Sequence, residues 1–181
     1  AALGFWYSEL NKKRDDFFKD RMQGSYLGPS FNDSEIEEEL IKVKATYKKI
    51  SEEKIYETVA KELSNGKTVG WFQGRMEFGP RSLGCRSILA DPRSDKIQKE
   101  LNLKIKFRES FRPFAPSVLF EDVSKWFNID DESPYMLLVA KIKENIRIKM
   151  SNEDKQLFGI KKLNVKRSSI PAVTHVDYTA R

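Results

Sequence analysis

The side chains of this sequence best suited to chemistry are cations, and they lie in two short segments. The first segment, residues 73–87, contains three arginines, Arg75, Arg81 and Arg86, among three glycines and a proline. Glycine lets a backbone come close to a ligand, and the arginine fork matches the paired oxygens of a phosphate or carboxylate. The segment lacks the Gly-Lys-Ser/Thr order of a Walker loop. The pattern predicts an irregular loop that binds an anion.

A second interpretation of this loop stays open at the level of sequence. Its arginines could instead pair with nearby carboxylates, those of Glu77, Asp91 and Asp95, and form an ordinary charged surface. Residue types alone do not decide between the two interpretations.

The second segment lies further along the chain and alternates cations with phenylalanines. In an extended backbone Lys106, Arg108 and Arg112 share one face, because side chains repeat every two residues. Phe107 and Phe111 then face the other way, into the core. The arrangement predicts a row of cations on an apolar base, suited to a triphosphate. The alternative is a basic edge strand that its charges keep soluble.

Two residue types that often catalyse reactions occur once each in the chain. His175 lies in an apolar stretch, which is typical of a core histidine with satisfied hydrogen bonds. Cys85 lies among arginines, which would lower the pKa of an exposed thiol, but no second histidine is present to act as its base. One cysteine and one histidine also exclude a zinc site built from this chain alone.

Positive charge is concentrated in the later part of the chain. The net charge is +6, and residues 67–181 carry 22 Lys/Arg against 14 Asp/Glu, whereas residues 1–66 carry 11 against 13. Six of the eleven arginines lie between Arg75 and Arg112. This density predicts an anionic partner, either the phosphates of a small molecule or a nucleic acid.

Length and composition limit the class of protein. The 181 residues fit one ordinary domain, or one domain with part of a neighbour, and 39% hydrophobic residues are enough for a core. No apolar run approaches the ~20 residues of a membrane span, so no membrane partner is expected. The first ten residues lack a signal-peptide pattern, and together with the single cysteine this leads us to expect a cytoplasmic location.

The expected helices and strands alternate, which indicates an α/β layered domain. Residues 1–7 are apolar, like the interior of a buried helix, and residues 23–32 break the chain with two glycines and a proline. Ser34 followed by Glu37 fits a capping box at a helix start. Residues 141–169 are polar and aperiodic and are expected on the surface. The other expected elements are a helix capped by Ser51 and ended by Asn65-Gly66, strands over 68–72 and 87–90, a helix over 95–103 capped by Ser94, strands over 114–120, 135–140 and 171–176, and a short helix over 123–127.

Several motifs of the chain point to one known family. They are Gln-Gly-Arg-Met-Glu-Phe-Gly-Pro-Arg at 73–81, Arg-Ser-Ile-Leu-Ala-Asp-Pro-Arg at 86–93, Phe-Arg-Pro-Phe-Ala-Pro at 111–116, His-Val-Asp at 175–177 and Ala-Arg at 180–181. Together they resemble the carboxy-terminal part of the carbamoyltransferases that modify nodulation factors, cephalosporins and tobramycin-type antibiotics. The resemblance covers about residues 26–181.

The resemblance implies a fold and a domain division. The fold is YrdC-like and of α/β class (α+β by some schemes), a three-layer domain in which helices flank a twisted mixed sheet. Residues 1–25 would be the tail and linker of a preceding carbamoyltransferase domain with an actin-like ATPase core. Residues 26–181 would be the YrdC-like domain, truncated before a Ser-Phe-Asn stretch that closes the nucleotide site. The isolated chain is therefore expected to be inactive or nearly so.

The resemblance also implies a reaction between two anionic small molecules, carbamoyl phosphate and ATP with Mg²⁺. Carbamoyl phosphate is cleaved, and the carbamate attacks the α-phosphate of ATP to form carbamoyl adenylate and pyrophosphate. The preceding domain, which holds iron or another metal, then transfers the carbamoyl group to an acceptor hydroxyl. No metal site is implied in this chain, and nucleic acid is not an expected partner.

The family motifs assign roles to seven residues of this chain. Cations must offset the repulsion between carbamate and ATP, and fixed charges stabilise the negative charge that grows on the α-phosphate. Holding the two substrates in line supplies the orientation term. The implied catalytic residues are Lys106, Arg112 and Arg81, and the implied cofactor-binding residues are Arg181, Arg75, Arg108 and Glu77.

Three positions depart from the family pattern, which often has Ala and Asn where this chain has Ser82 and Cys85, and Gly where it has Tyr178. The last departure places a tyrosine in a turn suited to glycine. Two other functions also stay open, a threonylcarbamoyl-adenylate synthase-like enzyme with the same fold and a non-catalytic RNA-binding module that uses the same basic face. The Gly-Pro-Arg and Phe-Arg-Pro-Phe-Ala-Pro signatures favour the carbamoyltransferase.

Overall fold

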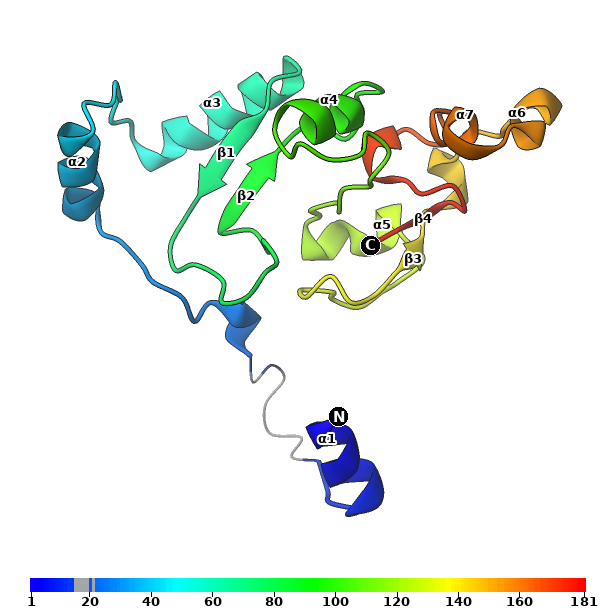
Figure 1. Cartoon of the computed structure of the whole chain (residues 1–181), viewed down its shortest axis with the longest axis horizontal. Coiled ribbons are helices and arrows are strands. Elements are labelled where there is room, and N and C mark those ends of the chain that lie inside the picture. The colour runs from blue at the N-terminus through cyan, green and yellow to red at the C-terminus, as the bar shows by residue number, and fades with distance from the viewer. Residues whose placement is uncertain (15–19, 21) are drawn as a thin grey trace.

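The structure is a computed structural model that describes residues 1–14, 20 and 22–181 (Figure 1). At the N-terminus the helix α1 (Ala2–Gly4) continues as a π-helical segment (Phe5–Glu9). The predicted helix is therefore present, but its large apolar side chains are exposed in this chain, those of Leu3, Phe5 and Trp6 among them. A 3₁₀ turn (Gln23–Ser25) follows.

The first two long helices each begin after an N-cap residue whose backbone is extended. In α2 (Asp33–Lys42) the capping box is present but lies two residues earlier than predicted. The Asn32 side chain accepts from the Glu35 amide at 3.0 Å, and the Glu35 carboxylate accepts from the Asn32 amide at 2.8 Å. Asparagine and serine cap equally well, so sequence alone could not choose between them. The helix α3 (Glu52–Ser64) begins after Ser51 and ends at the Asn65-Gly66 turn, as predicted.

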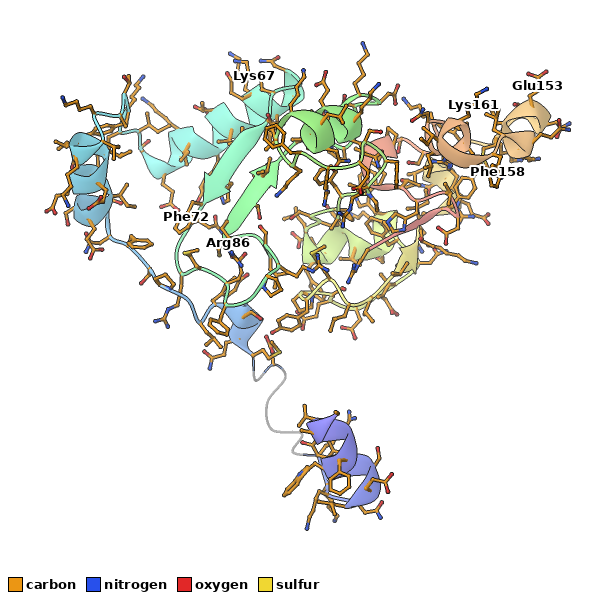
Figure 2. The ribbon with its side chains drawn as sticks, viewed as in Figure 1. Lys67, Phe72, Arg86, Glu153, Phe158 and Lys161 are labelled. Atoms are coloured by element: carbon orange, nitrogen blue, oxygen red, sulfur yellow. The ribbon has the colours of Figure 1, made fainter. Side chains whose placement is uncertain are left out.

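A β-hairpin follows α3 and confirms the first two predicted strands. The strands β1 (Val69–Phe72) and β2 (Arg86–Leu89) pair antiparallel, with Phe72 opposite Arg86 at the end where the loop begins. Figure 2 shows these two labelled side chains at that end of the hairpin. Trp71 packs against Tyr56 of α3, with ring centroids 6.4 Å apart. The hairpin thus presents the loop of residues 73–85 away from α3.

The helix α4 (Ile97–Lys104) begins two residues later than predicted, and its N-cap residue makes no side-chain hydrogen bond. Its buried residues Ile97 and Leu101 form a small core with Ala172. Ile88 of β2 and Phe114 pack against the same group. This core packs the segment that follows α4 against both the hairpin and the C-terminal part.

The C-terminal part is held by a second core made of short elements. Its buried residues are Phe127, Ile142, Ile170, Val173 and Ala180. The elements are a 3₁₀ turn (Phe120–Asp122), α5 (Val123–Trp126), β3 (Ala140–Lys141), a 3₁₀ turn (Glu144–Ile146), α6 (Asn152–Gln156), α7 (Gly159–Leu163), a 3₁₀ turn (Pro171–Val173) and β4 (Thr179–Ala180). The predicted short helix at 123–127 is thereby confirmed.

Three predicted strands in this part are wrong. Residues 114–120 form no strand, only Ala140 of residues 135–140 lies in one, and residues 171–176 begin with a 3₁₀ turn. Apolar runs suggested buried strands, but Leu119 and Leu137 are exposed. Prolines within two of the runs also remove backbone donors that a ladder needs.

The prediction that residues 141–169 lie on the surface holds only for part of the segment. Ile142 and Ser168 are completely buried, and Arg167 is 4% exposed. The helices α6 and α7 extend outward, and the labelled side chains of Phe158 and Lys161 project at the edge of the molecule in Figure 2. Aperiodic polarity was therefore a poor guide, because Ile142 and Ser168 are buried through isolated β-bridges with distant residues rather than through one amphipathic element.

The described residues form a mixture of helices and two small antiparallel sheets, β1-β2 and β3-β4. This agrees with the predicted α/β class at its coarse level. The larger twisted mixed sheet is not formed by the described residues. No helix in this described part is long and apolar enough to cross a membrane.

Candidate functional site

The loop at the end of the β1–β2 hairpin is organised by a buried carboxylate. Glu77 is 3% exposed. It accepts hydrogen bonds from the amides of Leu83 at 2.6 Å and Cys85 at 2.8 Å, and from Arg86 Nε at 3.2 Å. The loop therefore folds back around Glu77, and this carboxylate faces protein donors.

The Glu77 carboxyl is held in its charged form. Burial alone would raise its pKa, but hydrogen bonds from its own amide, from the Cys85 and Leu83 amides and from Arg86 outweigh burial and lower the pKa below its ordinary value. A lowered pKa in the folded state gives stability that is present above the ordinary glutamate value, about 4.3, and is lost as the pH falls through the lowered value.

We therefore expect acid to loosen this loop as Glu77 takes up a proton. As the pH falls below about 4.3, the amide NMR signals of Leu83 and Cys85 should shift together. The Glu77→Gln variant should lack this shared transition. Independent titration of the two amides would contradict the assignment.

The three arginines of this loop differ in their surroundings. Arg86 is tied down: besides Glu77 it donates to the carbonyl oxygens of Gly79 and Arg81. Arg75 Nε donates to the Gly28 carbonyl at 2.8 Å. The side chain of Arg81 is exposed, while its backbone is fixed through Arg86. Of the three, Arg81 is best placed to meet a ligand.

Residues 25–29 dock on this loop. The Gly28 amide donates to the Met76 carbonyl at 3.0 Å, and the Met76 amide donates to the Pro29 carbonyl at 2.9 Å. The Phe78 amide donates to the Ser25 carbonyl at 2.6 Å. A Cβ at Gly28 would lie 2.9 Å from the Met76 carbonyl oxygen, so this close pairing needs glycine. The pairing adds rigidity to the loop that carries Arg75 and Arg81.

Cys85 is buried, and its surroundings differ from those expected for a reactive thiol. It is 8% exposed, and burial and then the nearby Glu77 charge raise the pKa of its thiol. The suggestion that arginines lower this pKa applied only to an exposed cysteine. The thiol thus stays protonated near neutral pH, as expected for a structural residue.

The second cationic segment follows α4 as a turn rather than an extended strand. Phe107 has a positive φ of 48° and is 85% exposed, and Phe111 is 42% exposed. The prediction that these phenylalanines anchor the segment in the core is therefore wrong. The Arg108 guanidinium instead lies over the Phe114 ring, 4.9 Å from its centroid.

The cations of this turn are partly free to meet a ligand. Lys106 is exposed, and Arg112 is exposed with the Glu109 carboxylate 3.7 Å from its guanidinium. Arg108 is half-buried, and burial and then the neighbouring Arg112 charge lower its pKa. An anion bound beside Arg108 would offset this effect of the Arg112 charge.

Sequence reasoning missed Asn102, which holds this turn from beneath. Asn102 is completely buried; its Oδ1 accepts from Arg108 Nε at 2.5 Å, and its Nδ2 donates to the carbonyls of Ser110 at 3.1 Å and Arg112 at 2.8 Å. The sequence did offer a signal for Asn102, because it is a polar residue inside the predicted helix 95–103, just before the cationic segment.

Arg181 lies at the end of β4, in a separate part of the molecule. Its Nε donates to the Met136 carbonyl at 2.6 Å. Two residues before β4 ends, Tyr178 has a φ of +64°, so the turn is of the kind the family pattern fills with glycine. The Tyr178 ring lies 5.5 Å from the Arg147 guanidinium, and its hydroxyl donates to the Ile148 carbonyl at 3.2 Å. These contacts offset the backbone strain.

Two cavities lie beside the segment that follows Arg112. The larger, about 710 Å³, is lined mainly by apolar residues of α3, β2, α4 and residues 114–119, and Arg93 lies at its edge. The smaller, about 150 Å³, is lined by Arg181 and shares Ala115 and Pro116 with the larger. Residues 114–118 thus connect the surroundings of Arg112 with those of Arg181.

The predicted site residues fall into three groups on three segments. The structure brings together Arg75, Glu77 and Arg81 on the hairpin loop and Lys106, Arg108 and Arg112 on the turn after α4, and it holds Arg181 beside β4. Among the described residues, no hydrogen bond or ion pair joins side chains of different groups. Their convergence on one substrate stays a prediction.

Ion pairs with nearby carboxylates account for two further arginines, one of them with the buried Glu77. Arg86 pairs with Glu77 at 3.2 Å and Arg93 with Asp91 at 2.6 Å, as the alternative interpretation expected. Asp95 pairs with Lys166 at 3.0 Å rather than with an arginine. His175 is half-buried with its Nδ1 2.9 Å from the Thr179 hydroxyl, as expected for a satisfied histidine.

These features define a small α/β domain that exposes cations on rigid loops. The sequence model of the family described as "Carbamoyltransferase C-terminus" matches residues 60–181. The chain belongs to this family, which confirms the resemblance drawn from its motifs.

Comparison with relatives supports the same family. The chain is 54% identical over its whole length to an uncharacterized protein of Synechocystis, of which it spans 30%. It is 38% identical over its whole length to the nodulation protein NolNO of Sinorhizobium fredii, of which it spans 24%. Over 66% of the chain it is 40% identical to a 3'-hydroxymethylcephem-O-carbamoyltransferase of Amycolatopsis lactamdurans, of which it spans 18%. The chain thus spans less than a third of each of these relatives.

Proposed function

We propose that this chain is the substrate-activating part of an O-carbamoyltransferase. In this proposal it binds carbamoyl phosphate and ATP; water cleaves carbamoyl phosphate to carbamate and inorganic phosphate, and the carbamate attacks the α-phosphorus of ATP. A bond forms between a carbamate oxygen and the α-phosphorus, and the bond to the β-phosphate breaks to release pyrophosphate. The longer protein to which this chain would belong then transfers the carbamoyl group from carbamoyl adenylate to an acceptor hydroxyl.

The observation that carries the proposal is the exposure of Arg81, Lys106 and Arg112 on loops whose backbones are fixed from within. Both proposed substrates are anions, and exposed guanidinium groups form charge-assisted, paired hydrogen bonds with phosphate oxygens. Fixed loops let these charges act without reorganising during the reaction. Membership in the carbamoyltransferase family supports a carbamoyl donor as one of the substrates.

The finer parts of the proposal concern the fold, the metal and the location. We propose a YrdC-like fold, whose sheet is larger than the two small sheets described above. We also propose a cytoplasmic location. Mg²⁺ would arrive with ATP and be bound mainly by phosphate oxygens and water. In the described part of the chain, no group of three or more His, Cys, Asp or Glu side chains is arranged to hold a metal ion.

Calorimetric titration of the 181-residue chain tests the proposal. ATP with Mg²⁺ and carbamoyl phosphate should each give saturable binding, and threonine should leave both isotherms unchanged. An isotherm that requires threonine would favour the synthase-like enzyme. Absence of binding to either substrate, together with RNA binding that weakens steeply with salt, would contradict the proposal and favour the RNA-binding module.

A further inference from the structure

Each of the two cationic loops is built around one buried polar side chain. The Glu77 side chain is 0% exposed and Asn102 is 0% exposed, so neither can contact a bound substrate directly. We propose that Glu77 and Asn102 are positioning residues, which orient the substrate-binding cations and do not themselves bind substrate. This inference rests on the proposed function and adds to it a role for two residues.

In the hairpin loop the positioning acts on Arg81 through Arg86. The Glu77 carboxylate anchors Arg86 Nε at 3.2 Å, and the same guanidinium donates to the carbonyls of Gly79 and Arg81. The Arg81 backbone is thus held by a guanidinium that the carboxylate fixes in place. The two amides bound by Glu77, those of Leu83 and Cys85, close the loop on its other side.

In the turn after α4 the positioning acts on Arg108 and Arg112. Asn102 accepts from Arg108 Nε at 2.5 Å and donates to the Arg112 carbonyl at 2.8 Å, so one carboxamide fixes both residues. Gln98 adds a second, exposed donor to the Arg112 carbonyl at 3.2 Å. The carboxamide therefore holds Arg108 by its side chain and Arg112 by its backbone in the same turn.

Two nearly isosteric substitutions remove these bonds without removing a cation. In Glu77→Gln an amide NH₂ replaces one carboxylate oxygen, and it cannot satisfy both Arg86 and the two backbone amides. In Asn102→Asp a carboxylate oxygen replaces Nδ2 and faces two carbonyl oxygens. We expect each variant to weaken ATP binding to the 181-residue chain by about tenfold, because misplaced charges lose most of their paired contacts.

Double-mutant cycles separate positioning from a general effect on the fold. Once Arg81→Ala is present, Glu77→Gln should change ATP affinity by less than about twofold, whereas in an Arg112→Ala background it should keep its full effect. Asn102→Asp should keep its full effect in the Arg81→Ala background, whereas in the Arg112→Ala background only the part that acts through Arg108 should remain. A residue that only stabilises the fold would weaken binding equally in both backgrounds, and that result would overturn the proposal.

Matched controls and a milder variant accompany the cycles. Glu62→Gln on α3 and Asn145→Asp on the surface make the same chemical changes outside both loops, and they should leave affinity unchanged. If Asn102→Asp does not fold, Gln98→Ala replaces it, because it removes a donor to the same Arg112 carbonyl. Its loss, about threefold, should disappear in the Arg112→Ala background.

Amide hydrogen exchange distinguishes failure of this inference from failure of the proposed function. Glu77→Gln should speed exchange at Leu83 and Cys85 while exchange in α3 stays unchanged. Unchanged exchange at the two amides would overturn the positioning role whatever the chain binds. No ATP binding by the unmodified chain would instead contradict the proposed function, and it would overturn the substrate part of this inference with it.

Discussion

Alanine at position 112 is expected to weaken the binding of carbamoyl phosphate and of ATP by about 10- to 100-fold. A hydrogen bond to a charged group contributes about 1.5–3 kcal/mol, and each 1.4 kcal/mol corresponds to a tenfold change in affinity. Arg112 is exposed, and its ion pair with Glu109, at 3.7 Å on the surface, contributes little to stability. The measurement is calorimetric titration of the unmodified and Arg112→Ala chains with each substrate.

Lys161→Ala is the matched control for this prediction. It removes the same positive charge from α7, at the edge of the molecule where Figure 2 labels Lys161. Its effect on affinity should be below about twofold, since only long-range attraction is lost and salt screens it. Arg112→Lys should fall between the two variants, because it keeps the charge and loses the paired geometry. Equal losses for Arg112→Ala and Lys161→Ala would show that the basic surface acts only through its total charge.

Alanine at position 142 is expected to lower the free energy of unfolding by about 3 kcal/mol, within the range for truncating a buried isoleucine. Ile142 is completely buried in the C-terminal core, between Phe127 and Ala180. Its amide donates to the Tyr178 carbonyl at 2.9 Å, so the same residue joins β3 to the strand that leads to Arg181. Urea denaturation followed by circular dichroism measures the change.

Ile160→Ala is the control for this core substitution. Ile160 lies on α7 and is 59% exposed, so its replacement should change stability by less than about 0.5 kcal/mol. Loss of stability at Ile160 as large as at Ile142 would contradict the arrangement of this core.

The candidate site could be predicted in part from sequence because its cations lie in uninterrupted motifs. The hairpin loop was recognisable from the spacing of glycines and arginines between two β-type runs, and the structure places Arg81 there on an exposed, anchored loop. Phe107 shows the limit of such reasoning. Alternation predicts one face per residue type only for an extended backbone, and a turn with positive φ at Phe107 removes that alternation.

Local sequence by itself determined the long helices, the β1–β2 hairpin, the cationic segments and family membership, since capping, helical spacing and motif order act between near neighbours in the chain. Only the tertiary structure decided that Glu77, Cys85 and Asn102 are buried and that three apolar runs do not become strands. Burial depends on which distant segments cover a residue. A buried carboxylate such as Glu77 is stable only because amides and a guanidinium of its loop donate hydrogen bonds to it. These donors reach the carboxylate only in the assembled fold.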